Sequence, residues 1–263
     1  ANNSWVEFSQ TLDFEPYYFG SASTPADADA AVNTADPTAV APPASMIAGD
    51  LVLMIGHRRA ASATLTVSET GGQTWNTEAA VGNTNITARL FWCVFNGTWT
   101  ADPSVAFGAT VCNTVVMHVF RAPQIDWTWE VNTAQAELDF TAPSTPFTVT
   151  ITGQSPSGAV PVVTLAGWFT ADDNSWTSLA GTGWVVSGTA QYRNTSGSDQ
   201  SDSFAHLIQA VPTATGNVSK NQTVITGDAG TTLIVTLGAI APAGGASAGL
   251  ILPWLAQSSQ MVH

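Results

Sequence analysis

The sequence is built from short apolar runs, each ended by glycine, proline, asparagine or aspartate. The runs are rich in Val, Ile, Thr, Phe and Trp, which fit a pleated, partly buried surface. No stretch combines capping residues with a sustained 3.6-residue period, so the pattern does not indicate helices. The expected strands are Leu51–Ile55, Ala63–Val67, Ala88–Phe95, Val115–Phe120, Phe147–Ile151, Val160–Phe169, Gly183–Val186, Ala205–Val211, Gln222–Thr226 and Thr231–Leu237. They predict an all-β chain, an antiparallel, jelly-roll-like β-sandwich with extended N- and C-terminal segments.

Two turns are explicit in the sequence. Gly71 and Gly72 follow an alternating run and can adopt the positive φ that a tight turn needs. Asn96-Gly97 follows the run that ends at Phe95, which is a strong hairpin signal. We therefore expect a tight turn at the first site and a hairpin at the second.

The order of strand, Gly-Trp turn, strand and strand occurs twice, with a period of roughly 110 residues. We expect a β-sandwich domain over residues 46–241, whose halves, 46–133 and 134–241, either form separate sheet sets or interleave. The strand expected within the junction favours one continuous domain, and two tandem sandwiches are the alternative. Residues 1–45 are expected to form an extended contact segment, and residues 242–263 a flexible spacer with an apolar tail.

The chain is acidic and poor in charge. The chain has six Lys and Arg residues and 19 Asp and Glu residues, which gives a formal net charge of −13. Only 10% of residues are charged, against roughly 25% in an average soluble domain. This balance excludes nucleic-acid binding as the main function and disfavours an anionic membrane surface, because both need many cations. No stretch has the length of a membrane helix and no signal peptide is recognisable, so Ala1 follows either methionine removal or leader cleavage.

The residues that could support catalysis do not form a recognisable motif. The four histidines are His57, His118, His206 and His263, and we interpret His118 and His206 as core residues within apolar strands. Glu130, Glu137 and Asp139 lie close in sequence, but with this acidic surplus we interpret them as solvated carboxylates. The sequence therefore predicts no catalytic residue, no cofactor and no enzymatic activity.

Candidate metal ligands are scattered. Asp172-Asp173-Asn174, Asp27 with Asp29, and Asp199 with Asp202 offer oxygen atoms. None follows the twelve-residue calcium-loop spacing, so no metal site is predicted. Cys93 and Cys112 could form at most one disulfide, and their apolar surroundings favour buried free thiols.

Ten tryptophans in 263 residues are the most unusual feature of the composition. Most are expected in the core, since each buries ~150–250 Å². Trp127 and Trp129 share one face of a strand and could stack on a sugar ring or a neighbouring subunit, although a core position is slightly favoured. Trp176, which follows a polar loop, is the best candidate for exposure.

The ends of the chain contain the candidate partner contacts. An apolar tail follows a Gly- and Ala-rich spacer, and it either folds back on its own domain or docks on a neighbour. Trp5 begins a similar aromatic segment. The predicted contact residues are Trp5, Leu250, Ile251, Leu252, Trp254 and Leu255.

Several motifs together carry a resemblance. They are Gly49-Asp50-Leu51-Val52-Leu53 after a proline-rich lead, the segment from Thr66 to Trp75, the turn at Asn96-Gly97, and the strand from Thr231 to Ile240. From Gly49 to Ile240 the sequence resembles β-sandwich proteins found on the particles of tailed bacteriophages and in some bacterial surface proteins. The resemblance implies a capsid decoration, a head or tail appendage, or an adhesion module, and it supplies no functional residue.

We therefore expect a non-enzymatic virion structural protein that decorates the outside of a phage capsid. It would be assembled in the host cytoplasm and held by apolar and aromatic contacts, with the major capsid protein or other virion proteins as partners. A symmetric homo-oligomer is expected, for which a trimer is one candidate. The alternative is a carbohydrate- or receptor-binding module of a phage tail or bacterial surface, with Trp127, Trp129 or Trp176 stacking on glycans.

Overall fold

The computed structural model describes residues 15–24, 35–61, 64–68, 71–123, 126–141, 147–194, 199–222 and 229–242. Every regular element in these ranges is a β-strand, and every strand pairing is antiparallel. The predicted all-β, sandwich-like fold class is confirmed. Within the described ranges there is no helix long and apolar enough to cross a membrane.

The first half of the chain forms two sheets. A five-stranded sheet has the order β1-β8-β3-β6-β5, and a three-stranded sheet has the order β2-β7-β4. The strands are β1 (Tyr17–Thr24), β2 (Thr38–Ala39), β3 (Leu51–Arg58), β4 (Thr66–Val67), β5 (Asn76–Gly82), β6 (Thr87–Val94), β7 (Ser104–Ala106) and β8 (Asn113–Arg121).

The second half repeats this arrangement. A six-stranded sheet has the order β13-β15-β11-β17-β9, with β14 also paired to β15, and a three-stranded sheet has the order β10-β16-β12. The strands are β9 (Thr128–Thr141), β10 (Phe147–Ile151), β11 (Val162–Thr170), β12 (Trp176–Ala180), β13 (Val185–Val186), β14 (Tyr192–Asn194), β15 (Gln200–Gln209), β16 (Val218–Gln222) and β17 (Ala229–Ile240).

The two halves have the same topology. β9, β10, β11 and β12 take the places of β1 to β4; β13 and β14 together take the place of β5; and β15, β16 and β17 take those of β6, β7 and β8. This is the strand order of a jelly roll, except that the fifth strand lies on the large sheet. All pairings among the described strands stay within one half, so the halves do not interleave, and the boundary falls between β8 and β9.

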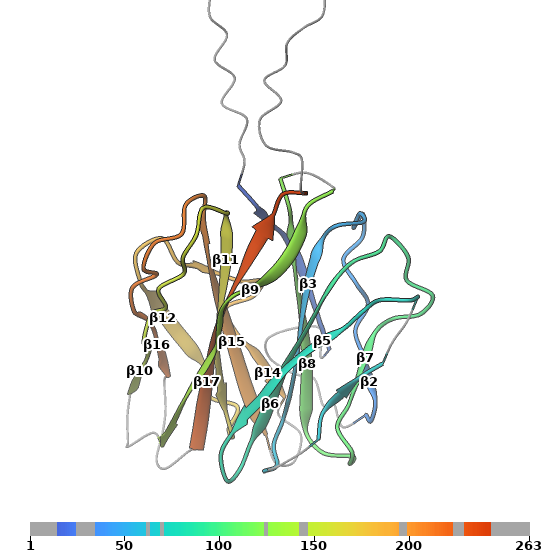
Figure 1. Cartoon of the computed structure of the whole chain (residues 1–263). Coiled ribbons are helices and arrows are strands. Elements are labelled where there is room, and N and C mark those ends of the chain that lie inside the picture. The colour runs from blue at the N-terminus through green and yellow to red at the C-terminus, as the bar shows by residue number, and fades with distance from the viewer. Residues whose placement is uncertain are drawn as a thin grey trace, which may run out of the picture.

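The four sheets stack as four layers, which Figure 1 shows from left to right: the second small sheet, the second large sheet, the first large sheet and the first small sheet. The inner strands of the large sheets, such as β3, β8 and β11, are therefore covered on both faces, while the edge strands β5 and β9 are largely exposed. On β3, Leu51, Leu53 and Ile55 face the core between the large sheets, while Val52 and Met54 face the first small sheet. We call the layer between the two large sheets the central core; it explains why β3 and β11 are continuous apolar runs.

Some expectations about individual segments were wrong. β1 lies within the segment expected to be an extended contact region, yet it pairs with β8 along its length. Asn96-Gly97 is a turn with positive φ at Gly97, but it connects β6 of the large sheet to β7 of the small sheet and closes no hairpin. β16 ends at Gln222, where the expected strand begins; the residues directly beyond it lie outside the described ranges. Gly71 and Gly72 do adopt positive φ, as predicted.

Candidate functional sites

The tryptophans proposed as stacking platforms face inward, which corrects the expectation for Trp176. Only 2% of Trp176 is exposed, and its Nε1–H donates to Ser201 Oγ at 3.1 Å. Trp129 is buried, with its Nε1–H donating to the carbonyl of Gly49 at 3.2 Å, and Trp127 packs half-buried against the same core. Alternation placed Trp127 and Trp129 on one face, as expected, but that face meets the other large sheet.

The predicted contact residues at the two termini, Trp5 and Leu250 to Leu255, lie outside the described residues. The described chain nevertheless shows where its ends are. Tyr17 at the start of β1 pairs with Arg121 at the end of β8, and Ile240 at the end of β17 pairs with Thr128 at the start of β9. Since β8 runs directly on to β9, both ends lie at one end of the molecule (Figure 1). We call this end the terminal pole.

The terminal pole has an apolar surface with a rigid support. Tyr17 is 48% exposed and Ile47 39% exposed, and both line a shallow hollow of about 180 Å³ together with Ala122 and Pro123. Behind the hollow, the Arg121 guanidinium donates to both carboxylate oxygens of Asp50 at 2.8 and 2.9 Å. This bidentate contact raises the pKa of Arg121 and ties the end of β8 to the turn before β3.

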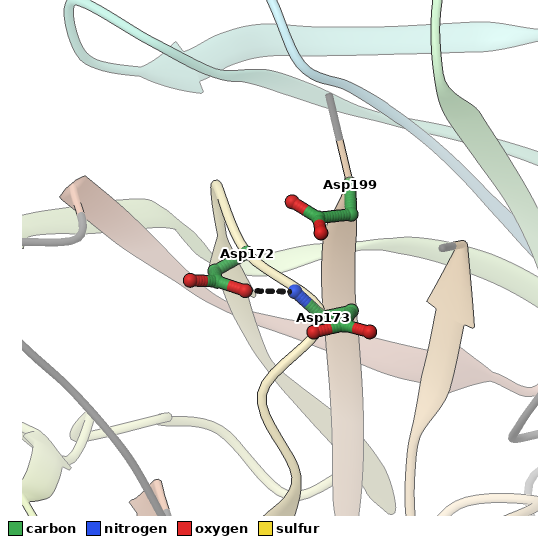
Figure 2. A group of neighbouring side chains, drawn as sticks. All are labelled: Asp172, Asp173 and Asp199. Carbon is green, nitrogen blue, oxygen red and sulfur yellow. Dashed lines mark hydrogen bonds between the residues drawn. The ribbon is translucent and has the colours of Figure 1, made fainter. Parts of the chain in front are cut away.

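Three of the carboxylates considered as metal ligands, Asp172, Asp173 and Asp199, lie together at the end of the central core opposite the terminal pole. Asp172 and Asp173 follow β11 and Asp199 precedes β15, and their oxygens lie within 4.8 Å of one another (Figure 2). They converge because β11 pairs with β15, with Thr170 opposite Ser201. Asp202, grouped with Asp199 in the sequence, instead points into the central core; Asp27 and Asp29 lie outside the described residues.

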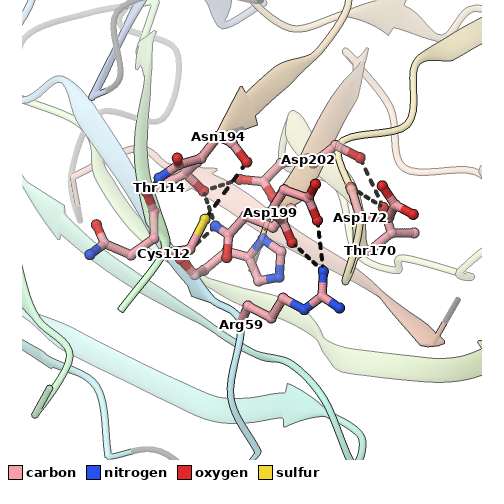
Figure 3. A network of polar contacts seen from close by, with 12 residues as sticks. Arg59, Cys112, Thr114, Thr170, Asp172, Asn194, Asp199 and Asp202 are labelled. Carbon is pink, nitrogen blue, oxygen red and sulfur yellow. Dashed lines mark hydrogen bonds and ion pairs between the residues drawn. The ribbon is translucent and has the colours of Figure 1, made fainter. Parts of the chain in front are cut away.

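The electrostatics of this acidic cluster favour internal pairing. Burial raises the pKa of Asp173, and its hydrogen bond with Asp172 adds to the rise. Burial also raises the pKa of Asp199, with the neighbouring carboxylates contributing. The Nη1 of Arg59 lies 2.8 Å from Asp199 Oδ1 (Figure 3). Two of the six carboxylate oxygens are already hydrogen-bonded, Asp199 Oδ1 to Arg59 and Asp172 Oδ1 to the backbone N–H of Asp173, which leaves fewer than the six or more oxygens that calcium takes.

Three histidines, His57, His118 and His206, are buried in the central core. His57 Nδ1 donates to the carboxylate of Asp202. His118 Nδ1 lies 3.2 Å from the hydroxyl of Tyr18, and His206 stacks on the Tyr18 ring at 4.6 Å. Burial lowers the pKa of His118 to about 3, with His206 adding to the effect, and lowers that of His206 to about 4. The interpretation of His118 and His206 as core residues is confirmed; His263 lies outside the described residues.

The three acidic residues considered for glycosidic cleavage do not form a pair across a cleft. Glu130 lies near the start of β9, about 23 Å along the strand from Glu137 and about 30 Å from Asp139. Glu137 accepts hydrogen bonds from the Gly82 backbone N–H at 2.7 Å and from Thr231 at 3.2 Å. Asp139 is exposed and lines a hollow between the two halves.

Lys220, the only lysine of the chain, was not singled out by the sequence analysis, although it alternates with Val218 and Gln222 on β16. Its side chain is buried, and Nζ donates to the carbonyl of Ala190 at 3.0 Å and to the hydroxyl of Ser203. Burial lowers its pKa to about 8. A serine beside a lysine of lowered pKa is the pairing of some nucleophilic sites, but both side chains are buried here, so no substrate reaches them.

Lys220 should make the protein more stable in mild alkali. The unfolded chain binds this proton up to a pKa of 10.5, while the folded chain releases it near 8. Between these values Lys220 is protonated mainly in the unfolded state, so its own contribution to the free energy of unfolding should rise by about 2 kcal/mol from pH 8 to 10, while the buried thiol of Cys93 acts in the opposite direction. Urea titrations at several pH values would measure it. The Lys220→Met variant should lose this rise. If its free energy of unfolding changes with pH as that of the unmodified protein does, the lowered pKa of Lys220 is wrong.

Cys93 and Cys112 are both free and buried, which confirms the favoured interpretation. Cys93 packs between the sheets of the first half, where burial raises its thiol pKa. Cys112 Sγ lies 3.7 Å from the carbonyl oxygen of Asn194, across the central core. Neither thiol is an accessible nucleophile.

No protein-family model matches the chain, and no curated protein or solved structure matches it either. No relative therefore supplies a residue role.

Proposed function

We propose that this protein is a non-enzymatic virion component that decorates the outside of a phage capsid and is held there by its terminal segments. The observation that carries the proposal is that both described ends of the chain leave from the terminal pole (Figure 1), beside the exposed side chains of Tyr17 and Ile47. Two segments that start at one pole can engage one surface together. The rest of the sandwich then faces outward.

The chemistry of these segments supports attachment by apolar burial. The segment beyond Pro242 contains no Asp, Glu, Lys or Arg and carries Leu250, Ile251, Leu252, Trp254 and Leu255. Uncharged contacts of this kind are not screened by salt, which suits a particle that meets variable ionic strength. A symmetric homo-oligomer, with a trimer as one candidate, would present several such segments to the major capsid protein at once.

The burial of the reactive side chains supports a structural role. His57, His118 and His206 lie in the central core, and Ser203 and Lys220 are buried between the sheets of the second half. The alternative function as a glycan-binding module with a tryptophan platform is weakened, because Trp129 and Trp176 are buried.

Deletion of Leu250–His263 tests the proposal. Burial of one large apolar side chain contributes about 1.5–3 kcal/mol, so loss of five should reduce binding to capsid particles at least a hundredfold. The fold should stay intact, since β17 ends at Ile240. Co-sedimentation with undecorated particles, alongside circular dichroism, would measure both properties.

The matched control is deletion of Gln257–His263, which keeps the five apolar residues and should bind like the full chain. If the longer deletion binds particles as tightly as the full chain, attachment through the tail is wrong.

A further inference from the structure

The two large sheets meet along two seams, because each sheet has an edge strand on either side. At the first seam β5 approaches β9 and β17. The backbone N–H of Gly82 donates to Glu137 at 2.7 Å, the side-chain amide of Gln135 donates to the carbonyl of Ala79 at 2.9 Å, and that of Asn83 donates to the carbonyl of Gly230 at 2.8 Å. We call this the β5 seam. Side-chain hydrogen bonds hold the β5 seam together, and none of the described strands pair across it.

The equivalent seam on the other side, where β1 approaches β14, is filled. Tyr192 is buried there, and a Cβ at Gly188 would lie 2.2 Å from the Tyr192 hydroxyl and 2.6 Å from Ser21 Oγ. At the β5 seam the position of Tyr192 is occupied by Val81. Tyr192 pairs with Asp202 of β15 and Val81 with Ala88 of β6, which are matching positions in the two sheets. A valine in place of a tyrosine leaves room.

A hollow of about 640 Å³ lies beside Val81 on the β5 seam, and its volume is within the range of small-molecule sites of roughly 300–1,000 Å³. Its lining includes Ala80, Val81, Thr84 and Asp139. A second hollow of about 200 Å³ shares Thr84 and Asp139 and continues towards Phe140. Within the described part of the chain, the side chains of Thr84 and Asp139 make no hydrogen bond or ion pair, so their polar atoms are open to a ligand.

The lining excludes several classes of ligand. The described lining residues include no Lys or Arg, so a phosphate or nucleic acid would meet only the negative charge of Asp139 among them. One carboxylate is too few for a calcium or magnesium ion. An added peptide strand would need free backbone groups on β5, but Gly82 N–H and the Ala79 carbonyl are already bonded.

We propose that the hollow at the β5 seam binds a neutral saccharide. The Asp139 carboxylate and the Thr84 hydroxyl would bond its hydroxyl groups, and Ala80 would contact its C–H surface. Such a site suits an exposed particle protein that meets glycans of a bacterial surface. It does not depend on attachment through the terminal pole, which lies on other residues.

The full chain should be titrated with glucose, galactose, mannose, N-acetylglucosamine and their β-linked disaccharides, using saturation-transfer NMR and calorimetry. At least one sugar should bind with a Kd of about 1 mM or tighter. Asp139→Ala should weaken it at least tenfold, since hydrogen bonds to a charged group contribute about 1.5–3 kcal/mol. Ala80→Trp, which fills the hollow from an exposed strand position, should abolish binding.

Glu130→Ala is the matched control, because it removes an exposed carboxylate from the same strand outside the hollow, and it should leave the Kd unchanged. The proposal is overturned if no sugar binds, if binding survives both Asp139→Ala and Ala80→Trp, or if inorganic phosphate competes for the site. None of these outcomes would affect particle attachment, which the tail deletion tests separately.

Discussion

Replacing Asp202 with alanine is expected to lower the free energy of unfolding by about 3–5 kcal/mol. Asp202 is 1% exposed and accepts a hydrogen bond from Thr114 Oγ1 (Figure 3). It accepts a second hydrogen bond from His57 Nδ1. Gln200 extends the network by donating to the carbonyl of His57 and to Thr114. Without the carboxylate, a buried imidazole N–H and a buried hydroxyl lose their acceptor.

Urea unfolding of the purified variant would measure this loss, with Asp102→Ala as control. Asp102 is exposed, so its removal should change the free energy of unfolding by less than about 0.5 kcal/mol. Equal stability of the two variants would show that the central core does not depend on this network. Asp202→Asn removes the charge but keeps the shape and one acceptor oxygen. Its free energy of unfolding should lie between those of Asp202→Ala and Asp102→Ala.

Acid should weaken the packing of the two halves before it acts on most carboxylates. His118 and His206 have pKa values of about 3 and about 4 in the folded chain, against 6.5 when unfolded. Below pH 6.5 the unfolded state therefore binds more protons, so stability falls as the pH falls. From pH 7 to 5 the two residues together should remove about 4 kcal/mol. The titratable groups around them are Tyr18, Tyr192, His57 and Asp202.

Urea midpoints between pH 7 and 5 would test this, since the slope reports the number of protons taken up. His206→Gln should roughly halve the slope. A flat profile for the unmodified protein over this range would contradict the assignment of two buried neutral histidines.

Several of the strands predicted from the sequence are covered on both faces, although β10, with only one face buried, was predicted as well. β3, β8 and β11 read as continuous Val-, Leu- and Ile-rich runs because one face meets a small sheet and the other meets the central core. β1, β5 and β9 were not predicted as strands, because their exposed edges carry polar and small residues that resemble loops. The two halves could be recognised from the repeated order of strands and turns in the sequence. The stacking of the four sheets could not, because it depends on packing between residues more than a hundred positions apart.

The candidate sites show the same limit. The acidic cluster needed the pairing of β11 with β15 to bring Asp199 beside Asp172 and Asp173. The hollow at the β5 seam is lined by ordinary alanine, valine and threonine residues from separate segments, so no motif marks it. Trp176 was expected outside because polar residues precede it, but the first residue of a strand can face either way.

The short link between β8 and β9 makes the association of the two jelly rolls intramolecular. If the same halves were separate chains, the fraction held together would fall as the protein was diluted. Joined in one polypeptide, they keep a fixed and high local concentration of each other. The four layers should therefore survive unlimited dilution.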